Sequence, residues 1–281
     1  MKKINKIEIT VIVSVKNEGL NLSKCLEKLG RFSQVIVVDS QSIDETLEIA
    51  KKMNAEILQF NWNGKFPKKR NWTLENASIK NEWVLFLDAD EFVTDNFVSE
   101  VEKKTINTAF NGFTIQFENY FMEKKLRYGY GFSKNTLFKR NKGKFEKIEE
   151  DSWSHLDMEV HEHPIIEGSI GVVNEKIIHN DFRGLEHYIS KHNAYSTWEA
   201  HRYLNMYKQT DLKLTTNQKI KYSLLNTGLL PFVYFFGAYI IKLGFLDGKP
   251  GYYLARYKAN YFFQIRTKII ELKRITKSNC N

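Results

Sequence analysis

Two aspartates separated by one residue follow a short apolar run. The run covers residues 83–87, Trp-Val-Leu-Phe-Leu, and the acidic residues behind it are Asp88, Asp90 and Glu91. If the run is a strand of an α/β sheet, these carboxylates lie at its carboxyl edge, where open α/β folds bind ligands. Carboxylate oxygens suit Mg²⁺ or Mn²⁺, which bridge the phosphates of a nucleotide and neutralise a departing diphosphate. The structural alternative is an acidic turn or a helix cap, which this motif alone does not exclude.

A second polar segment also follows an apolar run directly. It starts at Asp39, reads Asp-Ser-Gln-Ser-Ile-Asp, and ends at Asp44. Asp39 could accept hydrogen bonds from a base or a ribose, whereas Asp44 is better explained as a cap of the helix that follows. The first apolar run of the chain likewise ends in the polar residues 14–18. Carboxylates at two strand ends can build one pocket.

Histidines and carboxylates gather in residues 155–163, which read His-Leu-Asp-Met-Glu-Val-His-Glu-His. His161 and His163 could both bind zinc, as in a metal hydrolase. The spacing matches neither a zincin nor a deaminase motif, and surface histidines beside acidic residues are usually only solvated. Zinc hydrolysis is therefore a minor alternative.

The elements that position these residues alternate between strand and helix in the first part of the chain. Strands are predicted over residues 7–15, 35–38, 56–60 and 83–87, and helices over a stretch with Leu22, Leu26 and Leu29, over 45–53, and from Pro67 to about Ile79. This alternation predicts an α/β fold with a mostly parallel central sheet covered by helices.

Aromatic residues become frequent after residue 110, where the alternation loosens. Short strands are predicted over residues 113–120, 136–139 and 170–178, a helix over 185–204, and a polar basic segment over 208–221. Trp198 lies in the helical stretch and is expected to pack. We expect this half of the chain to receive a second substrate.

The composition limits the class of protein and its partners. The hydrophobic fraction is 42%, the charged fraction 27%, and the formal net charge +9. A basic surface attracts phosphates, nucleic acid or anionic lipid headgroups, and the charge alone does not decide among them. Cys25 and Cys280 lie at opposite ends of the chain and indicate no disulfide framework. The first apolar run is short and contains Glu8, which argues against a signal peptide and predicts a cytoplasmic protein.

The apolar tail allows three interpretations. Residues 223–241 contain no formally charged side chain, which approaches the length of a membrane span. Asn226, Gly228 and Pro231 weaken that interpretation, and a buried core helix is the second possibility. Lysines, arginines and tyrosines around the segment favour the third, a helical hairpin lying in the headgroup region of a membrane.

Three segments together resemble the nucleotide-sugar-binding motifs of family 2 glycosyltransferases. They are residues 11–18, Val-Ile-Val-Ser-Val-Lys-Asn-Glu, residues 37–44, Val-Val-Asp-Ser-Gln-Ser-Ile-Asp, and residues 88–91, Asp-Ala-Asp-Glu. Within that family the chain is similar to lipopolysaccharide core glucosyltransferases. The markers of that subgroup are residues 62–64, Trp-Asn-Gly, 69–71, Lys-Arg-Asn, 160–162, Val-His-Glu, and 244–248, Gly-Phe-Leu-Asp-Gly. The resemblance implies a GT-A-like fold and covers most of the chain.

The resemblance also assigns residues to the donor and the metal. It implies that Ser14, Glu18 and Asp39 contact the nucleoside. Asp90 would coordinate Mg²⁺ or Mn²⁺, and Asp88 would lie near the ribose or the metal.

Four basic or histidine positions have both a functional and a structural interpretation. Lys69 and Arg70 would face the diphosphate or close the pocket, since basic residues at a helix start oppose the helix dipole unless an anion binds there. A solvated helix start is the alternative. His179 would return to the metal ion, or act as a cap or core residue. Arg140 resembles a basic position near the acceptor, or is an exposed charge at a strand end.

Inversion at a sugar carbon requires a general base that deprotonates the acceptor hydroxyl. The resemblance singles out Glu162 as that base, with His161 orienting it, and Asp157 and Glu159 as competitors. Trp153 could stack on a sugar face or belong to the core.

These observations predict an inverting, metal-dependent glycosyltransferase. The expected donor is a nucleoside diphosphate sugar, with UDP-glucose the first candidate, and the expected acceptor is a lipid-anchored saccharide at the cytoplasmic membrane face. Residues 1–205 are predicted to form the GT-A-type domain, with a nucleotide-sugar half over 1–110 and an acceptor half over 111–205. Residues 206–281 are predicted to form a basic helical region that meets anionic lipid, and no nucleic acid partner is expected.

Two rivals remain at this point. A sugar nucleotidyltransferase shares the alternating fold, but those enzymes usually carry a Gly-rich, Arg-containing loop after the first strand, where residues 16–20 read Lys-Asn-Glu-Gly-Leu. A non-catalytic protein that binds anionic lipid or nucleic acid through its positive charge is the other rival.

Overall fold

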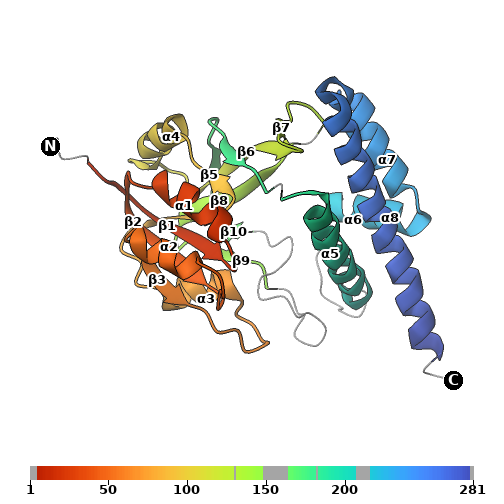
Figure 1. Cartoon of the computed structure of the whole chain (residues 1–281), viewed down its shortest axis with the longest axis horizontal. Helices are drawn as coiled ribbons and strands as arrows, with labels where there is room; N and C mark the ends of the chain where they lie inside the picture. The colour runs from red at the N-terminus through yellow and green to blue at the C-terminus, as the bar shows by residue number, and fades with distance from the viewer. Residues whose placement is uncertain (1–4, 130, 148–163, 182, 207–215, 279–281) are drawn as a thin grey trace. The chain divides into compact units, whose positions relative to one another are not determined.

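The computed structural model describes residues 5–129, 131–147, 164–181, 183–206 and 216–278 (Figure 1). Contacts divide the chain into two compact units, which we call unit 1 and unit 2. Unit 1 contains the described residues up to Glu118 and those between Phe132 and Asn180. Unit 2 contains the segment from Asn119 to Gly131 and the described residues after Asn180.

Four parallel strands form one part of the sheet in unit 1. In the spatial order β3-β2-β1-β4, they are β3 (Glu56–Gln59), β2 (Phe32–Asp39), β1 (Ile7–Val15) and β4 (Trp83–Asp88). The structure confirms these predicted strands. The apolar runs of β1, β2 and β4 are typical of parallel strands buried on both faces, whereas β3 is an edge strand and is only partly buried. Parallel pairing aligns their carboxyl ends at one edge, where Val15 is the register partner of Asp39 and Ser14 that of Asp88.

The helices of unit 1 are α1 (Gly19–Glu27), α2 (Thr46–Lys52), α3 (Lys69–Asn76) and α4 (Asp95–Thr105). α3 is shorter than the predicted helix that starts at Pro67 and ends near Ile79, because the flanking residues Lys68 and Ala77 have extended backbone angles. The sequence predictions do not include α4. Thr94 caps it by accepting the N–H of Phe97 at 3.2 Å.

The other strands of the sheet are mostly antiparallel to their neighbours. β8 (Ser133–Lys139) lies between β4 and β6 (Gly112–Phe121) and is antiparallel to both. β5 (Glu91–Phe92) pairs with β12 (Ile177–His179), and β9 (Gly143–Phe145) pairs with β10 (Pro164–Ile166) in a separate ribbon.

The prediction of one strand over residues 170–178 is wrong. β11 (Ile170–Val172) pairs with β6, whereas β12 pairs with β5. Between them the chain turns, and the backbone N–H groups of Asn174 and Glu175 donate hydrogen bonds to the carboxylate of Glu100 at 3.1 and 2.7 Å. This break is what carries β12 toward the acidic segment after β4.

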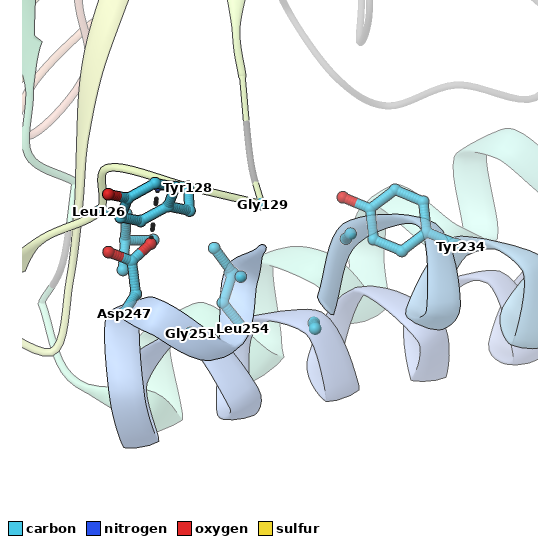
Figure 2. Close-up of a pocket in the computed structure, with 10 residues that line it drawn as sticks. Leu126, Tyr128, Gly129, Tyr234, Asp247, Gly251 and Leu254 are labelled. Carbon is cyan, nitrogen blue, oxygen red and sulfur yellow. Dashed lines mark hydrogen bonds between the residues drawn. The ribbon is translucent and has the colours of Figure 1, made fainter. Parts of the chain in front are cut away.

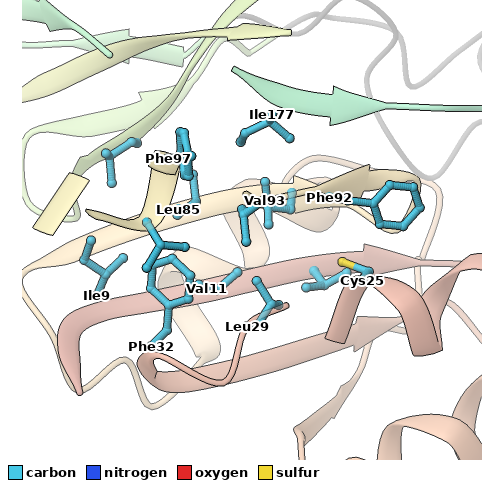
Figure 3. Close-up of a cluster of buried hydrophobic side chains, with 14 of the residues drawn as sticks. Ile9, Val11, Cys25, Leu29, Phe32, Leu85, Phe92, Val93, Phe97 and Ile177 are labelled. Atoms are coloured by element: carbon cyan, nitrogen blue, oxygen red, sulfur yellow. The ribbon is translucent and has the colours of Figure 1, made fainter. Parts of the chain in front are cut away.

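Two apolar clusters form the core of unit 1. β1 contributes Ile9, Val11 and Val13 to the larger cluster (Figure 3) and Ile12 to the smaller, because successive strand residues face opposite sides of a sheet. The larger cluster also holds Cys25, a free thiol whose pKa is raised by burial and by the charge of Glu91. Its thiol therefore stays protonated. Cys280 lies outside the described residues.

Unit 2 is mainly helical. Its elements are α5 (Leu185–Met206), α6 (Thr216–Thr227), α7 (Leu230–Phe236), the π-helical turn η1 (Gly237–Ile241), the 3-10 turn η2 (Gly244–Asp247), α8 (Gly248–Ser278), and the short strand β7 (Lys124–Lys125), which pairs with Tyr120 and Phe121. The predicted helix over 185–204 is confirmed, and Trp198 is buried within it. By contacts α5 groups with the C-terminal helices, and the domain boundary at residue 205 stays a prediction.

Helix length and hydropathy bear on the predicted apolar tail. Among the described helices, none is long and apolar enough by itself to cross a bilayer. One bent pair, Gln218–Thr227 with Leu230–Ile241, meets both criteria when its two parts are taken together across a bend of 116°.

Candidate active site

The carboxyl edge of the parallel strands brings the predicted nucleotide residues together. Asp39 is fully buried at the end of β2, and Ser14 is nearly buried at the end of β1. The register of β4 on β1 places Asp88 beside Ser14. The alignment follows from parallel pairing alone, which is why strand-end residues could be grouped from the sequence.

Hydrogen bonds tie the loop after β1 to the loop after β2. The N–H of Asn17 donates to Ser42 Oγ at 2.8 Å, and the N–H of Ile43 donates to Asn17 Oδ1 at 2.9 Å. Asp39 accepts the N–H of Ser42 at 3.1 Å. The N–H of Glu18 donates to Thr46 Oγ1 at 2.8 Å. The two loops are therefore held to each other by hydrogen bonds, and Asp39 takes part in that arrangement.

Asp44 lies at the start of two helices. Its Oδ1 accepts the N–H of Thr46, the first residue of α2, at 3.1 Å, which confirms the predicted capping role. Its Oδ2 accepts the N–H of Gly19, the first residue of α1, at 3.0 Å. Burial raises the pKa of Asp44, but the hydrogen bonds from Thr46 and Gly19 lower it more, so the pKa lies below its usual range.

Asp88 is held by two cations. Lys134 Nζ on β8 lies 2.8 Å from Asp88 Oδ2 and 2.7 Å from Glu91 Oε1, and Arg70 Nη2 lies 3.1 Å from Asp88 Oδ1. The N–H of Asp88 donates to Glu91 Oε2 at 3.0 Å. The sequence analysis missed Lys134, since a lysine within a strand gives no signal until β8 is placed next to β4.

The charges of this cluster move its pKa values in opposite directions. Burial raises the pKa of Asp88, but the charges of Lys134 and Arg70 lower it by more than burial raises it. The pKa of Asp88 is therefore well below its usual range. Burial and the charge of Asp88 raise the pKa of Glu91 against the opposing effect of Lys134. Burial lowers the pKa of Lys134, but both carboxylates raise it above its usual range. Asp88 and Lys134 are therefore charged at neutral pH.

His179 lies next to Asp90, as the sequence analysis expects of a late histidine. β12 pairs with β5 so that His179 is opposite Glu91, and the N–H of Asn180 donates to the carbonyl of Asp90 at 3.1 Å. His179 Nε2 is 3.7 Å from Asp90 Oδ2. The structure thus brings together an oxygen and a nitrogen donor from segments far apart in the chain.

The donor set can be compared with the needs of a divalent ion. Among the described residues, no group of three or more His, Cys, Asp or Glu side chains is arranged to hold a metal ion by itself. Mg²⁺ beside a nucleotide is commonly held by one or two carboxylates, with phosphate oxygens and waters completing its shell. Asp90 and His179 fit such an ion shared with a diphosphate, and Asp88 is already neutralised by Arg70 and Lys134.

The remaining predicted residues are placed differently. Lys69 is buried, and its Nζ donates to the carbonyl of Val15 at 3.1 Å, so it contacts the last residue of β1. Arg140 donates from Nη1 to the carbonyl of Ile79 at 2.7 Å. Six candidate residues lie outside the described residues: Trp153, Asp157, Glu159, His161, Glu162 and His163.

The sheet order, the strand-end carboxylates and the covering helices define a GT-A-like α/β fold. Comparison with known proteins identifies the family, since the model described as glycosyl transferase family 2 matches residues 10–160, more than half of the chain. The chain belongs to glycosyl transferase family 2.

Similar proteins cover almost the whole chain. An uncharacterized glycosyltransferase of Rickettsia conorii is 25% identical over 90% of this chain and 86% of its own length. The lipopolysaccharide core biosynthesis glycosyltransferase LpsC of Rhizobium meliloti is 24% identical over 95% of this chain and 94% of its own. The mannosyltransferase PcManGT from Pyrobaculum calidifontis, solved in complex with GDP-Man and Mn²⁺, is 14% identical and matches with a TM-score of 0.54 over 94% of this chain and 87% of that chain. This structural likeness concerns the fold.

Proposed function

We propose that the chain transfers one sugar, with inversion, from a nucleoside diphosphate donor to a hydroxyl of a lipid-anchored saccharide. UDP-glucose is the first donor to test, and Mg²⁺ or Mn²⁺ is the proposed cofactor. The observation that carries the proposal is the proximity of Asp90 to His179 at the carboxyl edge of the sheet, next to Asp88, whose charge is balanced by Lys134 and Arg70. LpsC, a relative of this chain, is described as acting in lipopolysaccharide core biosynthesis, which supports a saccharide of that class as the acceptor.

The residues of the site have separate roles in this proposal. Ser14, Glu18 and Asp39 line the strand ends where the nucleoside binds. Asp90 and His179 would hold the ion, which would supply positive charge to the departing diphosphate. Arg70 and Lys134 keep Asp88 ionised and fixed, so that the acidic turn presents Asp90 in one orientation.

The transfer step needs a base on the side of the sugar opposite the diphosphate. Glu162, with His161 orienting it, is the proposed base, and this assignment rests on the family resemblance. Glu162 takes the proton of the acceptor hydroxyl while the oxygen of that hydroxyl bonds to the anomeric carbon of the donor sugar. The bond from that carbon to the diphosphate oxygen breaks, and the electron pair leaves with the diphosphate.

The proposed place of action is the cytoplasmic face of a membrane. A lipid-anchored acceptor has its saccharide close to the headgroups, and the chain carries a formal charge of +9, which favours an anionic surface. Family membership disfavours the sugar nucleotidyltransferase. A non-catalytic lipid-binding role would require that the chain binds no nucleotide sugar.

The deciding experiment is a donor panel assayed with Mn²⁺, with Mg²⁺ and with a chelator. We expect one nucleotide sugar to be hydrolysed or transferred by the wild type. Asp90→Ala should lose metal-dependent binding of the nucleoside diphosphate, measured by calorimetry. Glu162→Ala should keep that binding and lose transfer by at least about a hundredfold, the usual size of a general-base contribution. Binding of no nucleotide sugar with either metal would overturn the proposal.

A further inference from the structure

The outward face of the segment from Leu229 to Ile241 in unit 2 is apolar. α7 and η1 bury Leu230, Pro231 and Ala238 on their inner side. The exposed side chains of this segment are all large and apolar, and they are Leu229, Phe232, Val233, Phe236, Ile240 and Ile241. A helix on the surface of a soluble protein normally presents charged or polar residues on that side. This face therefore differs from a solvated one.

Aromatic contacts join this face to η2 and the start of α8. Phe235 contacts Phe236, Tyr239 and Tyr252, with ring centroids 6.1, 5.3 and 6.1 Å away. Tyr239 also contacts Phe245 at 6.3 Å. Together with the exposed residues Leu243, Phe245, Leu246, Tyr252 and Tyr253, these side chains form one surface, which we call the aromatic face.

The charges around the aromatic face have one sign. Lys242, Lys249 and Arg256 are exposed beside it. Asp247 is the one acidic residue in the sequence between positions 223 and 270, and it is buried. Figure 2 shows its carboxylate pointing at the backbone of the loop that carries Tyr128, where it accepts the N–H groups of Arg127 and Tyr128 at 3.0 and 2.9 Å. No negative charge of this segment thus faces outward.

We propose that the aromatic face is a monotopic docking surface for an anionic lipid bilayer. The Phe, Leu and Ile side chains of this face insert at headgroup depth, and the basic residues around it contact lipid phosphates. Exposed apolar area of this kind marks a membrane or a protein partner. Charge selects between them. In a symmetric contact of two copies, each positive rim would meet the same rim, whereas an anionic bilayer neutralises it. Tyrosines at the edge suit the interface, since they place rings in the apolar layer and hydroxyls in water.

This inference supplies the membrane attachment that the proposed function assumes, and it is tested without any sugar transfer. The full chain is floated with vesicles of phosphatidylcholine alone and of phosphatidylcholine with one quarter phosphatidylglycerol. We expect binding to the anionic vesicles and at least tenfold weaker binding to the neutral ones. Donor hydrolysis in solution is measured on the same samples, so failure of the docking surface and failure of the glycosyltransferase assignment are separate results.

Two double variants examine the two parts of the surface. Phe232→Ser with Phe236→Ser removes exposed apolar rings and should abolish flotation. Lys242→Glu with Lys249→Glu should weaken binding to anionic vesicles by more than about twentyfold, at roughly fivefold per lysine lost. The matched control is Ile106→Ser with Ile165→Ser, two exposed side chains of unit 1, which should float like the wild type. Unfolding midpoints in urea confirm that each variant is folded.

Three outcomes would overturn the inference. One is flotation by folded protein that is unchanged in the Phe232 and Phe236 double variant. Another is a dimer, seen by light scattering without lipid and lost in that variant, because a second copy then covers the face. The third is retention of the wild type in vesicles after alkaline carbonate extraction, which indicates a spanning segment instead of surface docking.

Discussion

Lys134 is a single cation shared by two carboxylates. Its ammonium contacts Asp88 and Glu91, and less than a quarter of its side chain is exposed. It therefore has the role of a fixed charge in the acidic turn. Arg70 assists on the other oxygen of Asp88, so each oxygen of that carboxylate has its own cation. Asp90 lies between these two carboxylates in the chain, in the same acidic turn.

We expect Lys134→Met to lower the free energy of unfolding by about 3 kcal/mol, since the buried carboxylate of Glu91 and the partly buried one of Asp88 then lose their shared cation. Lys134→Arg keeps the charge and should lose much less. Urea unfolding at pH 7 measures both. Equal midpoints for Lys134→Met and the wild type would show that solvent already screens the pair.

His192 in α5 gives a pH dependence of known sign. Its Nε2 is 3.2 Å from Lys258 Nζ, and its Nδ1 donates to the carbonyl of Tyr188 at 2.9 Å. Burial, and then the charge of Lys258, lower the pKa of His192 to about 4. Burial and the charge of Lys191 lower the pKa of Lys258 to about 8. The neutral imidazole is therefore the native form.

The pKa of His192 is lower in the folded protein than the value of about 6.5 in the unfolded chain, so the unfolded chain takes up the proton first as the pH falls. The contribution of His192 to the free energy of unfolding is therefore fully present only above about pH 6.5. That contribution is lost as the pH falls from about 6.5 to about 4, and we expect the loss to be about 3 kcal/mol, at about 1.4 kcal/mol per pH unit. His192→Gln does not titrate, so its stability should change less over this range. Urea unfolding of both proteins at half-unit pH steps gives the difference, and parallel curves would contradict the assignment.

At the scale of elements, α4 shows how one side chain starts a helix. Thr94 precedes it with an extended backbone, and its side chain accepts the N–H of Phe97. Phe97, Val98 and Val101 then face the core. The cap fixes the first turn so that these three residues reach the sheet.

Thr94→Ala removes the oxygen that accepts this N–H and should destabilise the protein by about 1 kcal/mol. Thr94→Ser keeps the hydroxyl and should retain most of that stability. The measurement is the urea concentration at the midpoint of unfolding, fitted with one dependence of the free energy of unfolding on urea for all three proteins. A loss of equal size in Thr94→Ser would assign the effect to the methyl group of Thr94 instead.

The sequence predicts elements well where periodicity is strong. The buried strands β1, β2 and β4 have continuous apolar runs, and the grouping of Asp39 and Asp88 follows from their parallel pairing. The two-residue strand β5 has no periodicity, and the sequence does not separate its partner β12 from β11, because both are apolar. The neighbours of Asp90 and Asp88, His179 and Lys134, depend on these long-range pairings. His179 was expected from the resemblance, and nothing local indicated Lys134.

At the scale of the molecule, each unit has its own apolar core. Unit 1 is built on the clusters around β1, and unit 2 on a cluster that includes Tyr203, Tyr222 and Ile265. The sequence predicts the difference in class between an α/β part and a helical, aromatic part. The boundary between them at residue 205 stays a prediction, since the amphipathic pattern of α5 does not say which core the helix covers.

The contacts of Asp44 have a consequence for the thermodynamics of donor binding. One carboxylate joins the first residues of α1 and α2, so both strand-end loops are ordered when the chain folds. A nucleoside that binds against them, as proposed, meets groups that have already lost their conformational freedom. The loss of conformational entropy on binding then comes from the ligand and from residues outside these two loops. Loosening these loops by Asp44→Ala would shift that cost from folding to binding.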